Sequence, residues 1–65
     1  MTTHVEDQRF TLTDEDGDRL IVRPPGPKSD VFRVKIKPVV GAGGLVLATA
    51  DEMRALRDYL DTMLP

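Results

Sequence analysis

The chain has 65 residues, no cysteine and one histidine, and its nine basic and eleven acidic side chains leave a net charge of −2. This length makes one small domain, and without cysteines neither a disulfide nor a Cys-ligated zinc ion can stabilise it. Small domains without disulfides or structural metals often enlarge their hydrophobic core by oligomerisation, so we expect a homodimer. The charge gives no overall attraction to nucleic acid or to anionic membranes, and no long apolar run predicts a membrane span.

The N-terminal residues are polar and show no period. They predict a disordered tail over residues 1–8, followed by a single α+β domain over residues 9–65. The same residues contain neither a basic start nor an apolar stretch of the kind that secretory signals have. We therefore expect a cytoplasmic protein.

Polar and apolar residues alternate over residues 9–13 and again over residues 19–23, with Asp16 and Gly17 between them. Two alternating runs around an Asp-Gly turn are typical of a β-hairpin. The proline-rich segment at residues 24–30 interrupts the chain, because proline has no N–H to donate to a ladder.

The most regular alternation covers residues 31–37 and predicts a third strand. A glycine-rich connection leads from there to a short apolar strand at residues 45–48. Thr49 follows directly and forms the capping-box pattern with Glu52, so a helix is predicted from this point. Its apolar residues recur at steps of three and four, and the helix stripe consists of Met53, Leu56, Leu60 and Met63.

The predicted fold is therefore α+β, a four-stranded antiparallel β-meander packed by one C-terminal α-helix in the order β-β-β-β-α. The helix stripe would lie across the apolar side of the sheet and cover it. Some apolar residues are left over by this arrangement and are candidates for contact with a second chain. They are Ile21, Val39, Val40, Tyr59 and Leu64.

Charge is segregated along the predicted strands. Six of the nine basic residues alternate onto the outer sheet face, and none of the eleven acidic residues lies in the three alternating strands. The six are Arg9, Arg19, Arg23, Arg33, Lys35 and Lys37. Such a face could bind a phosphate backbone or an acidic partner, although an exposed sheet face also needs polar residues merely for solvation. No aromatic residue lies on it to stack with bases.

The basic strand at residues 33–37 together with the terminal helix resembles, in topology, the PC4-like and Whirly-like single-strand DNA-binding folds. In those families the strands form a curved basic surface and the helices form a dimer, which implies the same arrangement here. The segment LVLATADEMRAL, in which a strand runs directly into a helix start, is similar to small uncharacterised proteins of actinobacteria and their phages. That second resemblance implies no activity.

Other motifs are better explained as structure. Asp14–Asp18 resembles the start of a calcium loop, but the glycine comes two positions early and the twelfth position is a proline, so we interpret it as a hairpin turn. Gly41–Gly44 precedes a strand and lacks the G-K-[ST] of a phosphate loop. Pro24–Pro27 could present a short polyproline segment, but suits a plain loop. His4 and Ser29 have no catalytic partner nearby in sequence.

These observations predict a protein that is not an enzyme and needs no cofactor or metal. The leading hypothesis is a small interaction or regulatory protein that contacts an unknown protein partner and no membrane. The alternative is single-stranded nucleic-acid binding through the basic outer sheet face.

Overall fold

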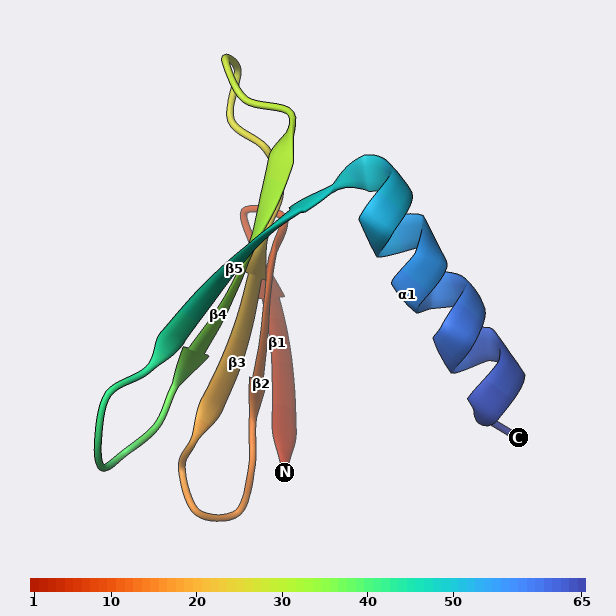
Figure 1. The fold of residues 1–65 in the computed structure, drawn as a ribbon. Coiled ribbons are helices and arrows are strands. Elements are labelled where there is room, and N and C mark those ends of the chain that lie inside the picture. The colour runs from red at the N-terminus through yellow and green to blue at the C-terminus, as the bar shows by residue number, and fades with distance from the viewer.

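The computed structural model describes all of residues 1–65 and consists of one antiparallel sheet and one helix (Figure 1). The strands lie side by side in chain order, so the sheet is a five-stranded meander. The predicted α+β class with an antiparallel sheet and a C-terminal helix is confirmed, but the sheet has five strands rather than four. The elements are β1 (Thr2–Glu6), β2 (Arg9–Thr13), β3 (Arg19–Arg23), β4 (Val31–Lys37), β5 (Gly44–Thr49) and α1 (Ala50–Met63).

The additional strand is β1, which lies where the sequence predicts a disordered tail. It pairs with β2 through a tight turn at Asp7 and Gln8, both of which have positive φ angles, 51° and 65°. Two consecutive residues with positive φ match the turn that two-residue hairpins prefer. The tail prediction is wrong for these residues because β1 is an exposed edge strand. An edge strand without a buried side needs no alternating pattern, and pairing alone holds it.

The β2–β3 turn is built by its own acidic residues. The Asp14 carboxylate accepts hydrogen bonds from the backbone N–H groups of Asp16 and Asp18, at 2.9 and 3.0 Å. Gly17 has a φ of 90° and donates its N–H to the Asp14 carbonyl, at 3.1 Å. The predicted hairpin turn is confirmed. The turn is also tied to the β4–β5 loop, because the Val39 N–H donates to the Asp18 carboxylate at 2.9 Å.

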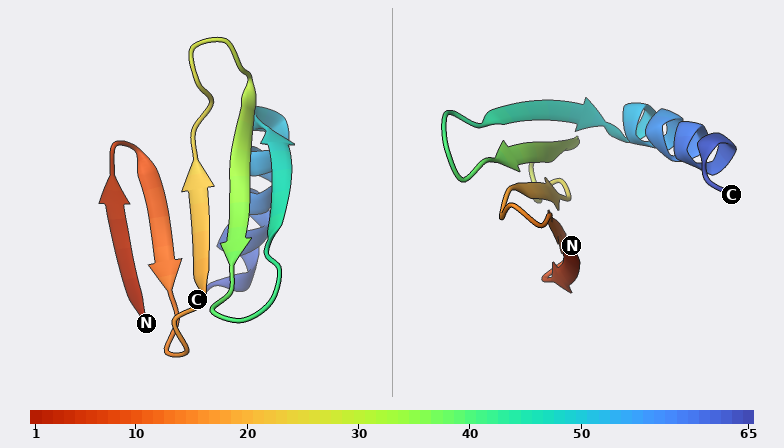
Figure 2. Two further views of the ribbon diagram at one scale, coloured as in Figure 1. Left: turned by 90° about the vertical axis from the view of Figure 1, so that its left-hand side faces the viewer. Right: turned by 90° about the horizontal axis from the view of Figure 1, so that it is seen from below.

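The predicted capping box starts α1. The Thr49 N–H donates to the Glu52 carboxylate at 2.8 Å, and the Glu52 N–H donates to the Thr49 hydroxyl at 3.2 Å. Thr49 is at once the last residue of β5 and the N-cap of α1, so no loop separates strand from helix. As Figure 2 shows, α1 extends from the end of β5 behind the edge of the sheet.

The prediction that the helix stripe covers the sheet is wrong. α1 contacts only β4 and β5, and no residue of α1 is buried. Leu56 and Leu60 remain 46% and 42% exposed. Because Thr49 both ends β5 and caps α1, the helix starts at the edge strand, and it runs on from there away from β1, β2 and β3. On a separate point, α1 has 14 residues and is neither long enough nor apolar enough to cross a membrane.

The sheet has an apolar face on the side where α1 lies. The register places Phe10, Val22, Val34 and Val46 in one row across the strands. A second row next to it contains Leu12, Leu20 and Ile36. We call these seven residues the apolar face. They are half-buried or exposed, and the only two buried residues of the whole chain are Ile21 and Ala48.

Ile21 lies on the opposite face, where its strand neighbours Arg19 and Arg23 also point. It is only 8% exposed, and Lys35 is its direct partner on β4. Arginine and lysine carry long apolar stems that can cover a residue between them while their charged ends stay in water. Little of Ile21 is therefore exposed for the predicted oligomer contact, which stays a prediction.

Candidate functional site

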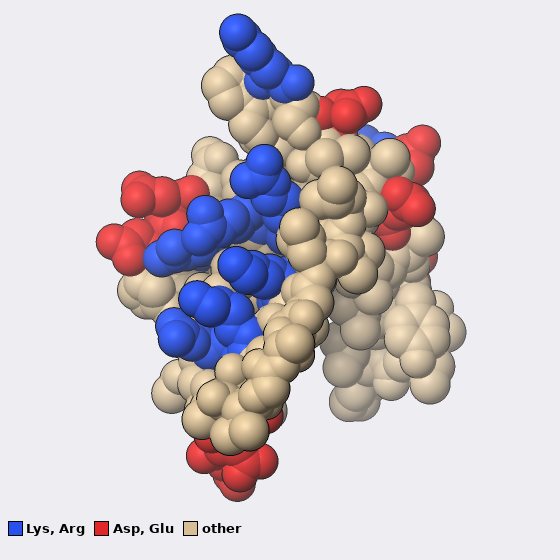
Figure 3. Space-filling view, turned by 60° about the vertical axis from the view of Figure 1, so that its left-hand side comes forward, with Lys and Arg blue, Asp and Glu red and all other residues tan.

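The six predicted basic residues share one face of the sheet, on the side away from α1, as Figure 3 shows. Arg23 is paired with Arg33, and Arg19 with Lys37, across β3 and β4. Paired residues on antiparallel strands point to the same side, so the register fixes this arrangement. We call this set the basic face: Arg9, Arg19, Arg23, Arg33, Lys35 and Lys37.

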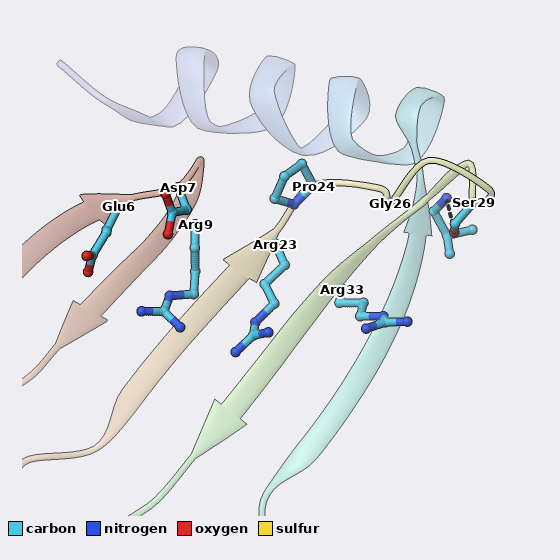
Figure 4. A pocket seen from close by; sticks show the side chains of 9 residues that line it. Glu6, Asp7, Arg9, Arg23, Pro24, Gly26, Ser29 and Arg33 are labelled. Carbon is cyan, nitrogen blue, oxygen red and sulfur yellow. Dashed lines mark hydrogen bonds between the residues drawn. The ribbon is translucent and has the colours of Figure 1, made fainter.

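Three arginines form a row at one end of the basic face. Arg9, Arg23 and Arg33 come from the adjacent strands β2, β3 and β4, which are about 4.8 Å apart in any such sheet. Figure 4 shows the side chains of Arg9 and Arg23 extending in similar directions and that of Arg33 extending toward β5. They line an open hollow of about 510 Å³ together with Gly26 and Ser29 of the β3–β4 loop. The hollow therefore combines three guanidinium groups with the Ser29 hydroxyl, and Glu6 and Asp7 line it on the β1 side.

No acidic side chain forms an ion pair with the basic face. The close contacts between basic and acidic side chains are His4–Glu6, Asp51–Arg54 and Arg57–Asp58, at 3.3, 2.5 and 3.1 Å. None of them involves the basic face, so no carboxylate oxygen lies within 4.0 Å of its nitrogens. The Arg9 Nε is shielded from solvent and has no hydrogen-bond partner. The other five residues of the basic face are exposed, so their cationic groups can bind an anion.

Apolar side chains border the same face on β5. Leu45 is paired with Lys35, and Leu47 with Arg33. The two leucines are 57% and 56% exposed. With Arg23, Arg33 and Lys35 they line a second hollow of about 360 Å³. Because Arg23 and Arg33 line both hollows, the charged row continues without a break into a partly apolar surface.

The sequence does not reveal the two leucines as part of this surface. Residues 45–48 are all apolar, so their pattern says nothing about which side faces outward. Only the register with β4 assigns Leu45 and Leu47 to the basic face.

Glu6 lies at the border of the basic face and also escaped prediction, because it belongs to the unpredicted strand β1. It is the direct partner of Arg9 on β2, yet its carboxylate contacts His4, with 3.3 Å between His4 Nε2 and Glu6 Oε2. Asp7 follows it in the turn and lines the first hollow beside Arg9. The basic face therefore ends at an acidic border on the β1 side.

The other predicted contact residues lie in two places. Val39 and Val40 are exposed in the β4–β5 loop, and Tyr59 and Leu64 are exposed on or just after α1. The structure does not combine them into one surface with Ile21, which is buried on the basic face.

The acidic cluster of the β2–β3 turn has a structural explanation. One carboxylate oxygen from each of Asp14, Asp16 and Asp18 lies within 4.8 Å of the others. Asp14 and Asp18 already accept backbone hydrogen bonds that hold the turn and the neighbouring loop.

No known protein family has a model that matches this chain, and neither the curated proteins nor the solved structures contain a significant match. The function must therefore be argued from the site.

Proposed function

We propose that the chain is a non-catalytic binding protein whose basic face binds single-stranded nucleic acid. The observation that carries the proposal is the basic face itself, six cationic side chains on one side of a sheet, none of which forms an ion pair. Phosphate groups are the anions that arginine recognises best, through paired N–H donors in a planar fork. A local cluster of this kind can bind a polyanion even where the net charge of the chain is slightly negative.

The shape of the face favours a single strand. A double helix is usually read by an element that enters its major groove, and the basic face has no protruding helix or ribbon. An extended strand can instead lie along the row of Arg9, Arg23 and Arg33 with its phosphates on the guanidinium groups. Leu45 and Leu47 then offer apolar contact to sugars and bases.

The residue types of the basic face also predict how the binding depends on salt and on nucleotide sequence. Stacking on aromatic side chains contributes about 1–3 kcal/mol per base in typical single-strand binders, and the basic face has no aromatic residue. Phosphate contacts must then supply most of the affinity. We expect binding that is strongly salt-dependent and tolerant of sequence.

A charge-reversal experiment tests the proposal. In fluorescence anisotropy with a labelled single-stranded DNA at low salt, Arg33→Glu/Lys35→Glu should weaken binding at least tenfold. Arg33 belongs to the arginine row and Lys35 lies next to it on the same face of β4, and each reversal replaces attraction with repulsion.

The matched control is Arg54→Glu/Arg57→Glu, which changes the net charge equally on the exposed side of α1. It should leave the affinity within about threefold of the wild type, because charges outside the contact act only at long range. If both variants lost affinity for DNA equally, the loss would follow from net charge alone, and this result would contradict binding at the basic face.

A second candidate is an acidic protein partner on the same face. Its support is the combination of arginine with exposed leucine at Arg33 and Leu47, since arginine is enriched and lysine depleted in protein interfaces. In this form the protein would act as an interaction or regulatory protein by occupying an acidic partner surface. Absence of DNA binding even at low salt would favour this candidate, and a specific partner recovered by wild type but not by Arg33→Glu/Lys35→Glu would support it.

A further inference from the structure

Away from the basic face, two apolar surfaces are left without a partner. One is the apolar face of the sheet, and the other is the helix stripe of α1, where Leu56, Leu60 and Met63 are all exposed. The register places the apolar face on the side of the sheet opposite the arginines, and α1 lies on that side as well (Figure 1). A sheet without a cover and a helix without a support are each unstable in water, because both expose apolar area that a layered fold buries.

We propose that a second copy of this chain occupies these surfaces. The two chains are related by a twofold axis, and the helix stripe of each packs on the apolar face of the other. Each chain supplies both halves of the contact, a helix that lacks a sheet and a sheet that lacks a helix. A contact of this kind is self-complementary and closes at two copies.

The exposed area supports this occupant. The accessible surface of the chain is 5407 Å². A folded monomer of 7.2 kDa has about 4,100 Å² by the usual size scaling, so this chain exposes about 1,300 Å² too much. Two chains that each bury that excess would form an interface of about 2,600 Å². Obligate homodimers typically bury about 2,000–5,000 Å² in total.

Electrostatics do not oppose the contact. The apolar face contains no charged residue, and neither does the helix stripe. The charged residues of α1, including the pairs Asp51–Arg54 and Arg57–Asp58, are exposed and can stay in water. The two basic faces then point outward on opposite sides of the dimer, so the proposal holds whether or not those faces bind nucleic acid.

Mass measurements test the proposal. Analytical ultracentrifugation of the wild type at micromolar concentrations should give twice the chain mass of 7.2 kDa. Leu56→Glu/Leu60→Glu should give the monomer mass. The control Leu45→Glu/Leu47→Glu changes two leucines of similar exposure on the basic side and should stay dimeric. A monomeric wild type, or a dimer that survives the helix substitutions, would overturn the proposal.

A cross-linking measurement covers the case in which the glutamate variants do not fold. The chain has no cysteine, so single cysteines can be placed on the two surfaces without background. A mixture of a Leu60→Cys chain with a Leu20→Cys chain should form mixed disulfide dimers under mild oxidation. Replacing the Leu20→Cys chain by a Leu45→Cys chain should lower the yield at least tenfold. Equal yields from both mixtures would overturn the exchanged arrangement.

Discussion

At the scale of single residues, backbone geometry explains one of the glycines of the β4–β5 loop. A Cβ atom on Gly43 would lie 2.2 Å from the carbonyl oxygen of Ile36 and 3.3 Å from the Pro38 ring. No heavy atoms pack so closely, so the loop has to open before any side chain fits. The neighbouring Gly44 has no atom within 4 Å of the same position. The sequence indicates a turn with glycines here, but it does not distinguish a glycine required by a close backbone contact from one that is merely tolerated.

This contrast gives a prediction for loop stability. Gly43→Ala should lower the free energy of unfolding by about 1–3 kcal/mol, the usual cost of forcing extra volume into a packed position. Gly44→Ala should change it by less than about 1 kcal/mol. Chemical denaturation of both variants measures the difference. Equal stabilities would show that the Ile36 carbonyl can move aside freely.

Ile21 shows where alternation is informative and where it fails. The period of two assigns Ile21 correctly to the same face as Arg19 and Arg23. It does not predict burial, because burial on that face depends on how the stems of the neighbouring strands' arginines and lysines lie. Ile21 and Ala48, the two buried residues, are on opposite faces of the sheet. A prediction that places the whole core on one face of the sheet does not anticipate buried residues on both faces.

At the scale of elements, strong local signals predicted most of the strands and the helix. The alternating segments became β2, β3 and β4, and the Thr49–Glu52 box starts α1. β1 was missed because an exposed edge strand carries no amphipathic signal. The predicted position of α1 was wrong. The direction in which a helix packs depends on the geometry of its connection to the preceding strand, here β5, and the hydrophobic period of the helix contains no information about that geometry.

The cap of α1 predicts a pH dependence. Hydrogen bonds from the Thr49 backbone N–H and, second, from the Thr49 side chain lower the pKa of Glu52 below its usual 4.5. A lowered pKa means that the charged carboxylate stabilises the folded cap. That stabilisation is complete above pH 4.5 and is lost as the pH falls through the lowered pKa.

Glu52→Gln provides the comparison, because its amide can accept a hydrogen bond but does not titrate. The wild type should unfold at a higher temperature than Glu52→Gln at neutral pH, and the two melting curves should converge as the pH falls below 4.5. Circular dichroism at the helix band measures both. A difference that stays constant down to strongly acidic pH would contradict the assigned role of the carboxylate.

At the scale of the whole molecule, the chain presents two unlike sides. One side has the basic face with its two hollows, and the other has the apolar face together with the helix stripe. The six basic positions could be assigned to one side from the sequence, because that needs only alternation. Their lack of ion pairs, their continuity with Leu45 and Leu47, and the excess accessible area all depend on register and on the path of α1. The two proposed roles therefore use different surfaces. The basic face would bind the polyanion, and the apolar face and the helix stripe would form the dimer interface.

The most direct test of the central claim is the salt dependence of single-stranded DNA binding, measured by anisotropy at several salt concentrations. Each phosphate neutralised on a single strand contributes about −0.7 to the slope of log K against log salt, so six basic side chains give a slope of up to about −4. We predict saturable binding with a slope between about −2 and −4, reduced by about 1 in Arg33→Ala/Lys35→Ala. Binding that is independent of salt, or no binding at low salt, would contradict the proposal that the basic face binds single-stranded nucleic acid.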